Sequence, residues 1–199
     1  MIKNDNWIKE QANNGMIQPF VPELVREHIS YNDIASKKVI SYGLSSYGYD
    51  IRLSNKDFRV FKHIPGTVID PKNFSANNLE SITSHKDDTG EYFYLPGHSY
   101  GLGVAVEYLE IPNNITVLCI GKSTYARCGI IANLSPGEAG WKGHLTLEFS
   151  NSSPADAKLY CNEGIVQLLF FEGEPCKTTY EDRKGKYQNQ GHQVTIAKV

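Results

Sequence analysis

The sequence lacks several features that would assign it to a familiar class of protein. No apolar run approaches the roughly 18 residues of a membrane-spanning helix, and residues 1–15 contain no apolar segment with a small-residue cleavage site. The formal net charge is only −2, so there is no general basic field for duplex nucleic acid. We therefore expect a cytoplasmic protein that binds neither membranes nor nucleic acid. Anionic ligands would have to meet local groups of cations.

Cysteine and histidine are present, but not at metal-binding spacings. The four cysteines include no C-x-x-C pair, which argues against a zinc knuckle. None of the six histidines is followed two residues later by Glu, and Pro175-Cys176 lacks the second cysteine of a P-C-x-x-C motif. We expect no zinc site and four reduced thiols. These are Cys119, Cys128, Cys161 and Cys176.

A nucleotide-binding P-loop is also missing. Residues 121–123 (GKS) match the end of that motif, but Thr116 stands where its first glycine is required. Any recognition of phosphate would need a loop of another kind.

What the sequence does contain is mostly the pattern of β-strands. From about Gly48, short runs rich in Val, Ile, Tyr, Phe and Thr alternate with turn signals such as Pro65-Gly66. At 199 residues with 40% apolar side chains, the chain has the size of one domain, 1–199. We predict a mainly β sandwich or distorted barrel. The runs that most favour strands are 100–111, 143–151 and 164–172.

Short helices are predicted before this β region. Asn4 or Asp5 is suited to cap a helix that stops at Asn14-Gly15. A second helix is predicted from about Pro22. Its apolar face would consist of Leu24, Val25 and Ile29.

Two polar segments are expected to lie outside the core. Residues 73–90 should form an exposed loop. Residues 183–191 form a polar tail that is too irregular for a core element. Together with Tyr180 this tail is basic and rich in amides, a composition suited to closing over an anionic ligand, although a solvated charged tail is the plainer interpretation.

One carboxylate is predicted in the middle of a strand. Residues 144–149 (HLTLEF) alternate polar with apolar side chains. In a strand this alternation places His144, Thr146 and Glu148 on one face and the apolar side chains on the other. Taken alone, Glu148 is an exposed charge on a solvated sheet face. Upstream, residues 121–127 (GKSTYAR) combine cations with hydroxyl groups, which could hold a polyphosphate or could be a basic surface turn.

Together these segments resemble the dCTP deaminase family in order and spacing, over most of the chain. The resemblance implies a distorted β-barrel of the dUTPase-like (β-clip) type, and a homotrimer whose active sites lie between subunits. The similar segments are residues 45–52 (SSYGYDIR), 121–127, 140–143 (GWKG), 147–149 (LEF), 162–167 (NEGIVQ) and 186–187 (KY).

The resemblance also implies a reaction, the zinc-independent hydrolysis of dCTP to dUTP and ammonia, which belongs to pyrimidine deoxynucleotide metabolism and leads to dUMP for dTTP synthesis. Glu148 would be the general base for water that attacks C4 of cytosine, and then the acid for the departing amine. Burial should raise its pKa for this purpose. Ser123 would orient the water, and Arg127 would stabilise charge beside the base.

Substrate-binding positions follow from the same resemblance. Lys122 and Thr124 would contact phosphate oxygens, and backbone groups of residues 146–148 would contact the cytosine edge. Mg²⁺ would arrive bound to the triphosphate rather than in a protein site. The full set is Lys122, Ser123, Thr124, Arg127, Thr146, Leu147, Glu148, Gln167, Tyr180, Lys186 and Gln190.

Alternatives stay open. A bifunctional deaminase that continues to dUMP and pyrophosphate, or a plain dUTPase, would have a similar barrel and turn. Diphosphate hydrolysis needs a carboxylate in loop 133–141, where only Glu138 is available. Ser135 and Ala139 replace a usual Thr and Pro in that loop and leave the role of Glu138 open. A catalytically silent nucleotide sensor would keep the phosphate contacts and lack Glu148.

Overall fold

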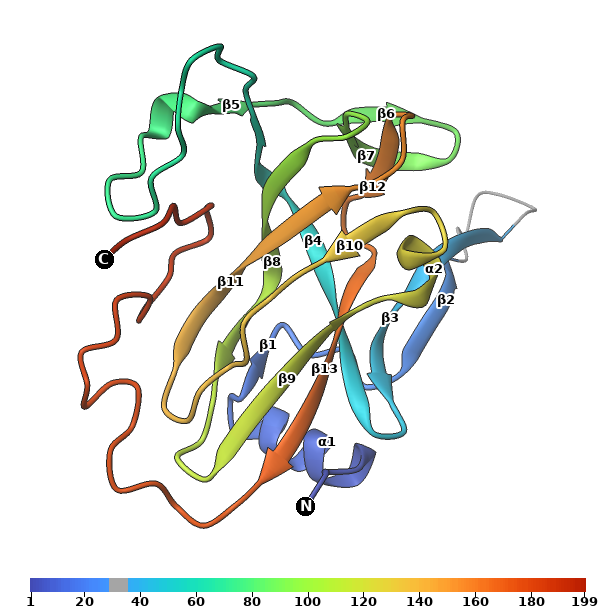
Figure 1. The fold of residues 1–199 in the computed structure, drawn as a ribbon. Helices are drawn as coiled ribbons and strands as arrows, with labels where there is room; N and C mark the ends of the chain where they lie inside the picture. Colours follow the sequence, from blue (N-terminus) through green and yellow to red (C-terminus); the bar gives the residue numbers. More distant parts are fainter. Residues whose placement is uncertain (29–35) are drawn as a thin grey trace.

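The computed structural model describes residues 1–28 and 36–199 and is mainly β (Figure 1). In these two ranges, ten strands form one large sheet that curls into a half-barrel, and three more form a small sheet at one end. The mainly β fold predicted from the sequence is confirmed. Within the described residues, no helix is long and apolar enough to cross a membrane.

The central strands of the large sheet run in the order β10-β11-β8-β4-β13-β9. Two α-helices and one 3-10 turn accompany them: α1 (Asp5–Asn13), α2 (Ser123–Ala126) and η1 (Ala76–Asn78). The large sheet contains β1 (Ile17–Gln18), β2 (Leu24–His28), β3 (Lys37–Ser45), β4 (Gly48–Phe61), β5 (Leu79–Ser81), β8 (Tyr100–Glu110), β9 (Ile115–Gly121), β10 (Ile130–Ala132), β11 (Lys142–Asn151) and β13 (Gly164–Glu172). The small sheet contains β12 (Ala157–Tyr160), β7 (Gly90–Leu95) and β6 (His85–Asp87).

The three runs that most favoured strands are confirmed as β8, β11 and β13. Their inward side chains pack closely because two glycines of β8 leave room for neighbours. A Cβ at Gly103 would lie 2.7 Å from Leu53 Cδ1, and one at Gly101 would lie 2.9 Å from the Phe58 ring. Phe58 in turn stacks on Phe149 with ring centroids 6.0 Å apart. This packing holds β11, the strand that carries Glu148, in a defined register against β8.

The N-terminal helix α1 begins and ends where the sequence predicts. The Asn4 side chain accepts a hydrogen bond from the Trp7 backbone N–H at 3.2 Å, which satisfies one of the free donors of the first turn. The helix stops at Asn14, and Gly15 follows with a φ of +98°. Its buried residues are Ile8 and Ala12.

Asn4→Ala should lower the free energy of unfolding by about 1 kcal/mol, because the first turn of α1 loses its side-chain acceptor. Urea denaturation followed by circular dichroism measures this change. Asn4→Asp keeps an acceptor oxygen and should unfold at nearly the wild-type urea concentration. Equal stability of the alanine variant and the wild type would show that the cap makes no net contribution.

The second predicted helix is wrong. Residues 24–28 form the strand β2, which pairs antiparallel with β3 and sets Leu24 opposite Gly43 and Val25 opposite Tyr42. Hydrogen bonding to a neighbouring strand therefore outweighed the helical spacing of the apolar residues. Ile29, the third residue of the predicted apolar face, lies outside the described residues.

The exposed loop predicted over residues 73–90 is also partly wrong. Most of its side chains are exposed, but it contains η1, β5 and β6. β5 pairs with β4, where Arg59 lies opposite Ser81 and Phe61 lies opposite Leu79. The buried Leu79 anchors this strand, and Phe74 and Ile82 on either side of it also pack against the core, so a few apolar residues within a polar segment attach it to the sheet.

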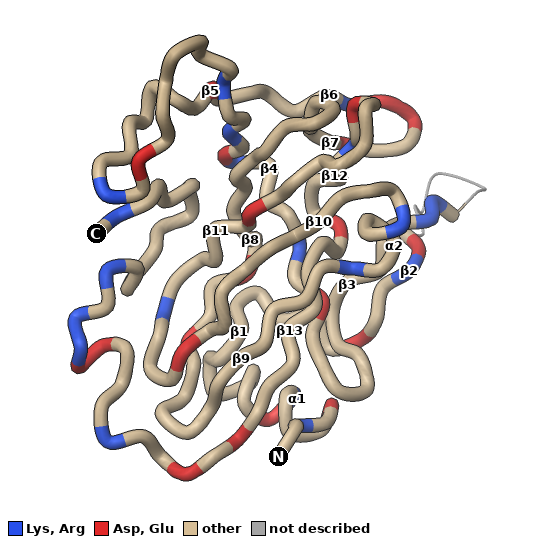
Figure 2. Tube along the Cα trace, viewed as in Figure 1, with Lys and Arg blue, Asp and Glu red and all other residues tan. Residues whose placement is uncertain are grey.

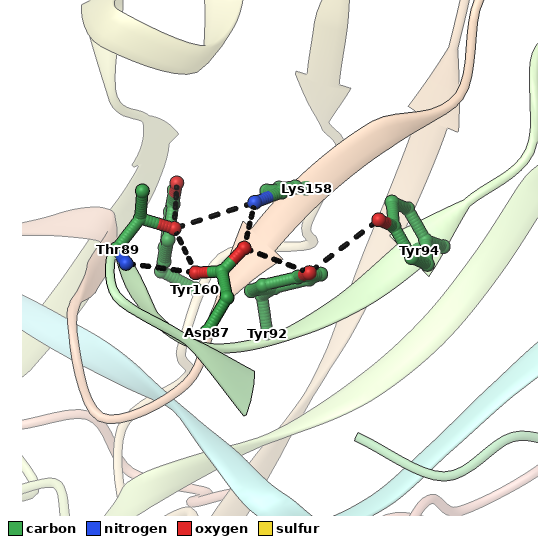
Figure 3. A network of polar contacts seen from close by, with 6 residues as sticks. All are labelled: Asp87, Thr89, Tyr92, Tyr94, Lys158 and Tyr160. Atoms are coloured by element: carbon green, nitrogen blue, oxygen red, sulfur yellow. Dashed lines mark hydrogen bonds and ion pairs between the residues drawn. The ribbon is translucent and has the colours of Figure 1, made fainter. Parts of the chain in front are cut away.

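A network of polar side chains joins the strands of the small sheet (Figure 3). Lys158 on β12 lies 2.6 Å from a carboxylate oxygen of Asp87 on β6, and its ammonium lies 4.0 Å from the centre of the Tyr92 ring on β7. Tyr92 donates a hydrogen bond to the same carboxylate at 3.1 Å. The hydrogen bond from Lys158 is the main reason that the pKa of Asp87 lies below its ordinary value. The network connects all three strands, and we assign it a structural role.

Candidate active site

A cavity of about 780 Å³ lies beside β8 and β11. Leu102 from β8 and Thr146 and Glu148 from β11 contribute to it, together with residues of loop 134–141 and of the C-terminal tail. In Figure 1 this tail runs alongside β11, and Figure 2 shows Lys and Arg positions along it. The aromatic lining consists of Phe61, Phe74, Tyr100, Trp141, Tyr180 and Tyr187.

Glu148 is a half-buried carboxylate in this cavity. It lies opposite Leu102 in the β11–β8 pairing, and within the described residues its side chain makes no hydrogen bond or ion pair under 4 Å. Burial raises its pKa above the ordinary value. Burial and the charge of Glu148 together raise the pKa of Tyr100, whose ring also lines the cavity. A carboxylate in such a place exchanges a proton more readily near neutral pH than an exposed one.

Glu148→Gln should raise the thermal midpoint of unfolding by a few degrees at neutral pH, as measured by calorimetry. The raised pKa means that the folded state holds the proton more tightly than the unfolded state. Ionised Glu148 therefore destabilises the fold above its folded pKa, and this penalty disappears below the ordinary value of 4.5. The two proteins should converge below about pH 4.5. A lower midpoint for the variant at neutral pH would contradict the assigned direction.

The tail is held against β11 by backbone and side-chain hydrogen bonds. The His144 N–H donates to the Gln190 carbonyl at 3.0 Å, and the Thr146 hydroxyl donates to Gln190 Oε1 at 2.9 Å. Gly143 has a φ of +141°, and a Cβ there would lie 2.6 Å from the Gln190 nitrogen. The structure therefore brings Thr146 and Gln190, two predicted site residues, into direct contact.

Tyr180 and Trp141 anchor the basic part of the tail. The Tyr187 N–H donates to the Tyr180 hydroxyl at 3.0 Å, and the Trp141 indole N–H donates to the Tyr187 carbonyl at 2.7 Å. Lys186, next to Tyr187, lines the cavity with Tyr180. Glu138 also lines it, but its carboxylate forms an ion pair with Arg183 of the tail.

The other predicted site residues lie elsewhere on the chain, at α2 and on β13. Lys122 is 2.5 Å from an Asp50 carboxylate oxygen. Arg127 is exposed and contacts the carbonyl of Ser123. In Figure 1, α2 and the tail lie on opposite sides of the ribbon. The group at α2 and β13 consists of Lys122, Ser123, Thr124, Arg127 and Gln167, and none of these lines the cavity that contains Glu148.

Two details of β11 differ from the simple alternation. Leu147 is fully buried, so only its backbone could meet a ligand. Leu145 lines the cavity beside Thr146 and Glu148, although alternation placed it on the opposite face. The β11–β8 register shifts between His144 and Thr146, which explains the change of face.

Sequence reasoning missed most of the aromatic wall. Phe61, Phe74 and Tyr100 come from segments that are far from Glu148 in the chain, and their rings meet edge-on or at a tilt. They carried no motif that could have assigned them to the site. Asp50, the partner of Lys122, lies in residues 45–52, a segment that resembles the dCTP deaminase family. Its carboxylate could therefore have been selected from the sequence as a candidate partner for a cation of the site.

A cavity that contains a half-buried carboxylate with no partner among the described residues, beside a basic tail, has the features of a small-molecule enzyme site. The sequence profile of the family described as dCTP deaminase-like matches residues 2–173. The chain belongs to this dCTP deaminase-like family.

Individual relatives cover nearly the whole chain. It is 50% identical over 200 residues to the dCTP deaminase of Aromatoleum aromaticum, which covers 100% of this chain and 99% of the relative. It is also 50% identical over 197 residues to the dCTP deaminase of Wolbachia pipientis wMel, with 98% and 97% covered. The solved 2′-deoxycytidine 5′-triphosphate deaminase from Agrobacterium tumefaciens has a similar fold, with a TM-score of 0.55 at 15% identity. That match covers 92% of this chain and about half, 51%, of the solved one.

Proposed function

We propose that this chain is an enzyme that hydrolyses the 4-amino group of dCTP to give dUTP and ammonia, with Glu148 as general base and then general acid. The observation that carries the proposal is the position of Glu148, half-buried in the cavity and without a partner among the described residues, where burial raises its pKa. Membership of the dCTP deaminase-like family supports the choice of substrate.

The proposed chemistry needs one group that moves a proton twice. Ionised Glu148 accepts a proton from water as the water oxygen bonds to C4 of cytosine and the electrons of the C4–N3 double bond move onto N3. The protonated carboxyl then returns this proton to the amino group. The bond from C4 to the amino nitrogen breaks to release ammonia as the C4–N3 double bond re-forms, and a proton shift from the new hydroxyl to N3 gives the carbonyl of uracil. The raised pKa suits both steps, since the two protonation states of Glu148 lie closer in energy at neutral pH than those of an exposed glutamate.

The tail would hold the triphosphate. Lys186, Tyr180 and Gln190 line the cavity with Glu148, and they supply a cation, a phenol and an amide to an anionic ligand. Within the described ranges, no three His, Cys, Asp or Glu side chains converge on one metal-sized point. We propose that Mg²⁺ arrives on the triphosphate, where it would neutralise phosphate charge.

A neighbouring subunit of a homotrimer would supply the second half of the site. Ser123 and Arg127 do not line the cavity of their own chain, so we place them in the part of the site that a neighbouring chain would supply. Apolar side chains on the outer face of β9 and β10 lie close to α2 in sequence and support such an assembly. They are Leu118, Ile120 and Ile131, which are 42%, 42% and 53% exposed.

The alternatives are less well supported by the geometry. A bifunctional deaminase or a dUTPase needs a free carboxylate to activate water at the phosphates, and Glu138 is engaged by Arg183. A half-buried carboxylate without a partner lowers the stability of the fold. A silent nucleotide sensor has no catalytic use for such a group, so Glu148 favours an enzyme.

The test is to incubate the purified chain with dCTP and Mg²⁺, and to separate the products by ion-exchange chromatography with an assay for ammonia. We expect dUTP and ammonia in equal amounts. Accumulation of dUMP and pyrophosphate would favour the bifunctional alternative. Intact dCTP would overturn the proposed activity.

A further inference from the structure

Two histidines stack where the tail leaves the cavity. His144 lies on β11 and His192 lies in the tail, and their rings are nearly parallel, with centroids 4.3 Å apart and an angle of 5° between the planes. The pair is flanked by two attachments of the tail to β11. On one side Gln190 bonds to His144 and Thr146, and on the other the Thr195 N–H donates to the Thr146 hydroxyl at 3.1 Å.

We propose that His144 and His192 are positioning residues that clamp the tail against β11, and that the clamp holds only while both imidazoles are uncharged. The proposal deepens the proposed function, because the clamped segment carries Lys186 and Gln190 into the cavity. It can nevertheless be tested without substrate. Neither histidine lines the cavity itself, so each would act through the tail.

Within the described residues, backbone carbonyls of β8 partly compensate a positive charge on His144, but burial outweighs them and lowers its pKa. From β8, the edge of the Tyr108 ring meets His144, and the Ala105 carbonyl lies 3.2 Å from His144 Nδ1. From β4, the cation of Lys56 acts on His192. Two protonated rings at this separation would repel each other.

The carboxylates of the neighbouring strands are already engaged. Asp57 on β4 lies 2.8 Å from Arg59 and accepts a hydrogen bond from the Val194 N–H at 3.0 Å. Glu107 on β8 is fully buried and bonds to Arg52 at 2.7 Å. Neither carboxylate is therefore available as a counterion for a charged histidine pair.

The direction of the pH dependence follows from this arrangement. Partial loss of solvent around the stacked rings lowers the pKa of both, and the charges of His144 and Lys56 lower that of His192 further. Above the ordinary value of 6.5 both rings are neutral whether the tail is clamped or free, so the clamp has its full strength. As the pH falls below 6.5, the histidines take up protons more readily when the tail is free than when it is clamped. The population of the clamped state therefore decreases until the pH passes the lowered pKa values of the clamped histidines.

Trp141 reports on the tail because its indole N–H bonds to the Tyr187 carbonyl. The sequence contains two tryptophans, so Trp7→Phe leaves Trp141 as the single reporter. We expect the emission of Trp141 to change when the protein is titrated from about pH 8 to about pH 5 without nucleotide, with a midpoint below 6.5. The equilibrium constant that favours the clamped tail over the free tail should fall approximately tenfold over this range.

Matched variants in the same Trp7→Phe background separate the clamp from other titrations. The double variant His144→Phe/His192→Phe keeps two rings that can stack but cannot take a proton, and its emission should be flat with pH; circular dichroism checks that it folds, since His144 is half-buried and His192 is exposed. His63→Gln removes an exposed histidine elsewhere and should titrate like the parent. A flat parent, or a double variant that titrates like the parent, would overturn the clamp. Because no nucleotide is present, failure of the deaminase assay would leave this result unaffected.

Discussion

Glu148→Gln is expected to lower kcat for dCTP deamination by about 10²- to 10⁴-fold while changing KM little. The amide keeps the size and polarity of the side chain but cannot accept the proton of the attacking water. The carboxylate has no partner within the described residues, so its removal breaks no ion pair that would disturb the cavity. Steady-state release of ammonia measures kcat and KM together.

The control for this result is Glu110→Gln. Glu110 is an exposed carboxylate on β8, 3.5 Å from Lys142 and outside the cavity, and its amide variant should keep wild-type kcat. The thermal midpoint supplies a second check, because Glu148→Gln should be inactive and yet at least as stable as the wild type at neutral pH. Wild-type kcat in the Glu148 variant would remove this residue from the mechanism.

Co-refolding of Glu148→Gln with Arg127→Ala in equal amounts should recover about a quarter of wild-type activity, although each variant alone is nearly inactive. If each site takes Glu148 from one subunit and Arg127 from its neighbour, random assembly gives both intact residues to about one site in four. Arg127 is exposed at α2 and absent from the cavity of its own chain, so its removal should not unfold the subunit.

The controls for the mixing experiment are the two variants refolded separately and wild type refolded in the same way. Sedimentation of each sample should show a single oligomer of three chains, because activity can return only where subunits mix. If the mixture were as inactive as the separate variants while the trimer formed normally, both residues of a site would have to come from one chain. A monomer with full activity would also contradict a shared site.

Local chemistry made parts of this molecule predictable. Asn4 and Gly15 bound α1 because capping and a positive φ depend on residues close in sequence. β8, β11 and β13 follow from runs of β-branched and aromatic residues. Glu148 could be selected only together with the segments around it, whose order and spacing indicated the family that the comparisons then established.

Other features depend on which distant segments meet. Residues 24–28 have a spacing that also suits a helix, and only the edge of β3 made them a strand. The register shift in β11 turned Leu145 into the cavity, and His192 meets His144 only because the tail returns along β11. No local pattern encodes these contacts.

The sequence by itself determined the local elements and the chemical groups available to the site, because propensity, capping and functional-group chemistry act over a few residues. Only the tertiary structure decided that Glu148 is half-buried with no partner in the described part of the chain, that Glu138 is bound to Arg183, and that α2 lies apart from the cavity. Burial and pairing are properties of contacts between distant segments, and they set the pKa and the free energy of each charged group.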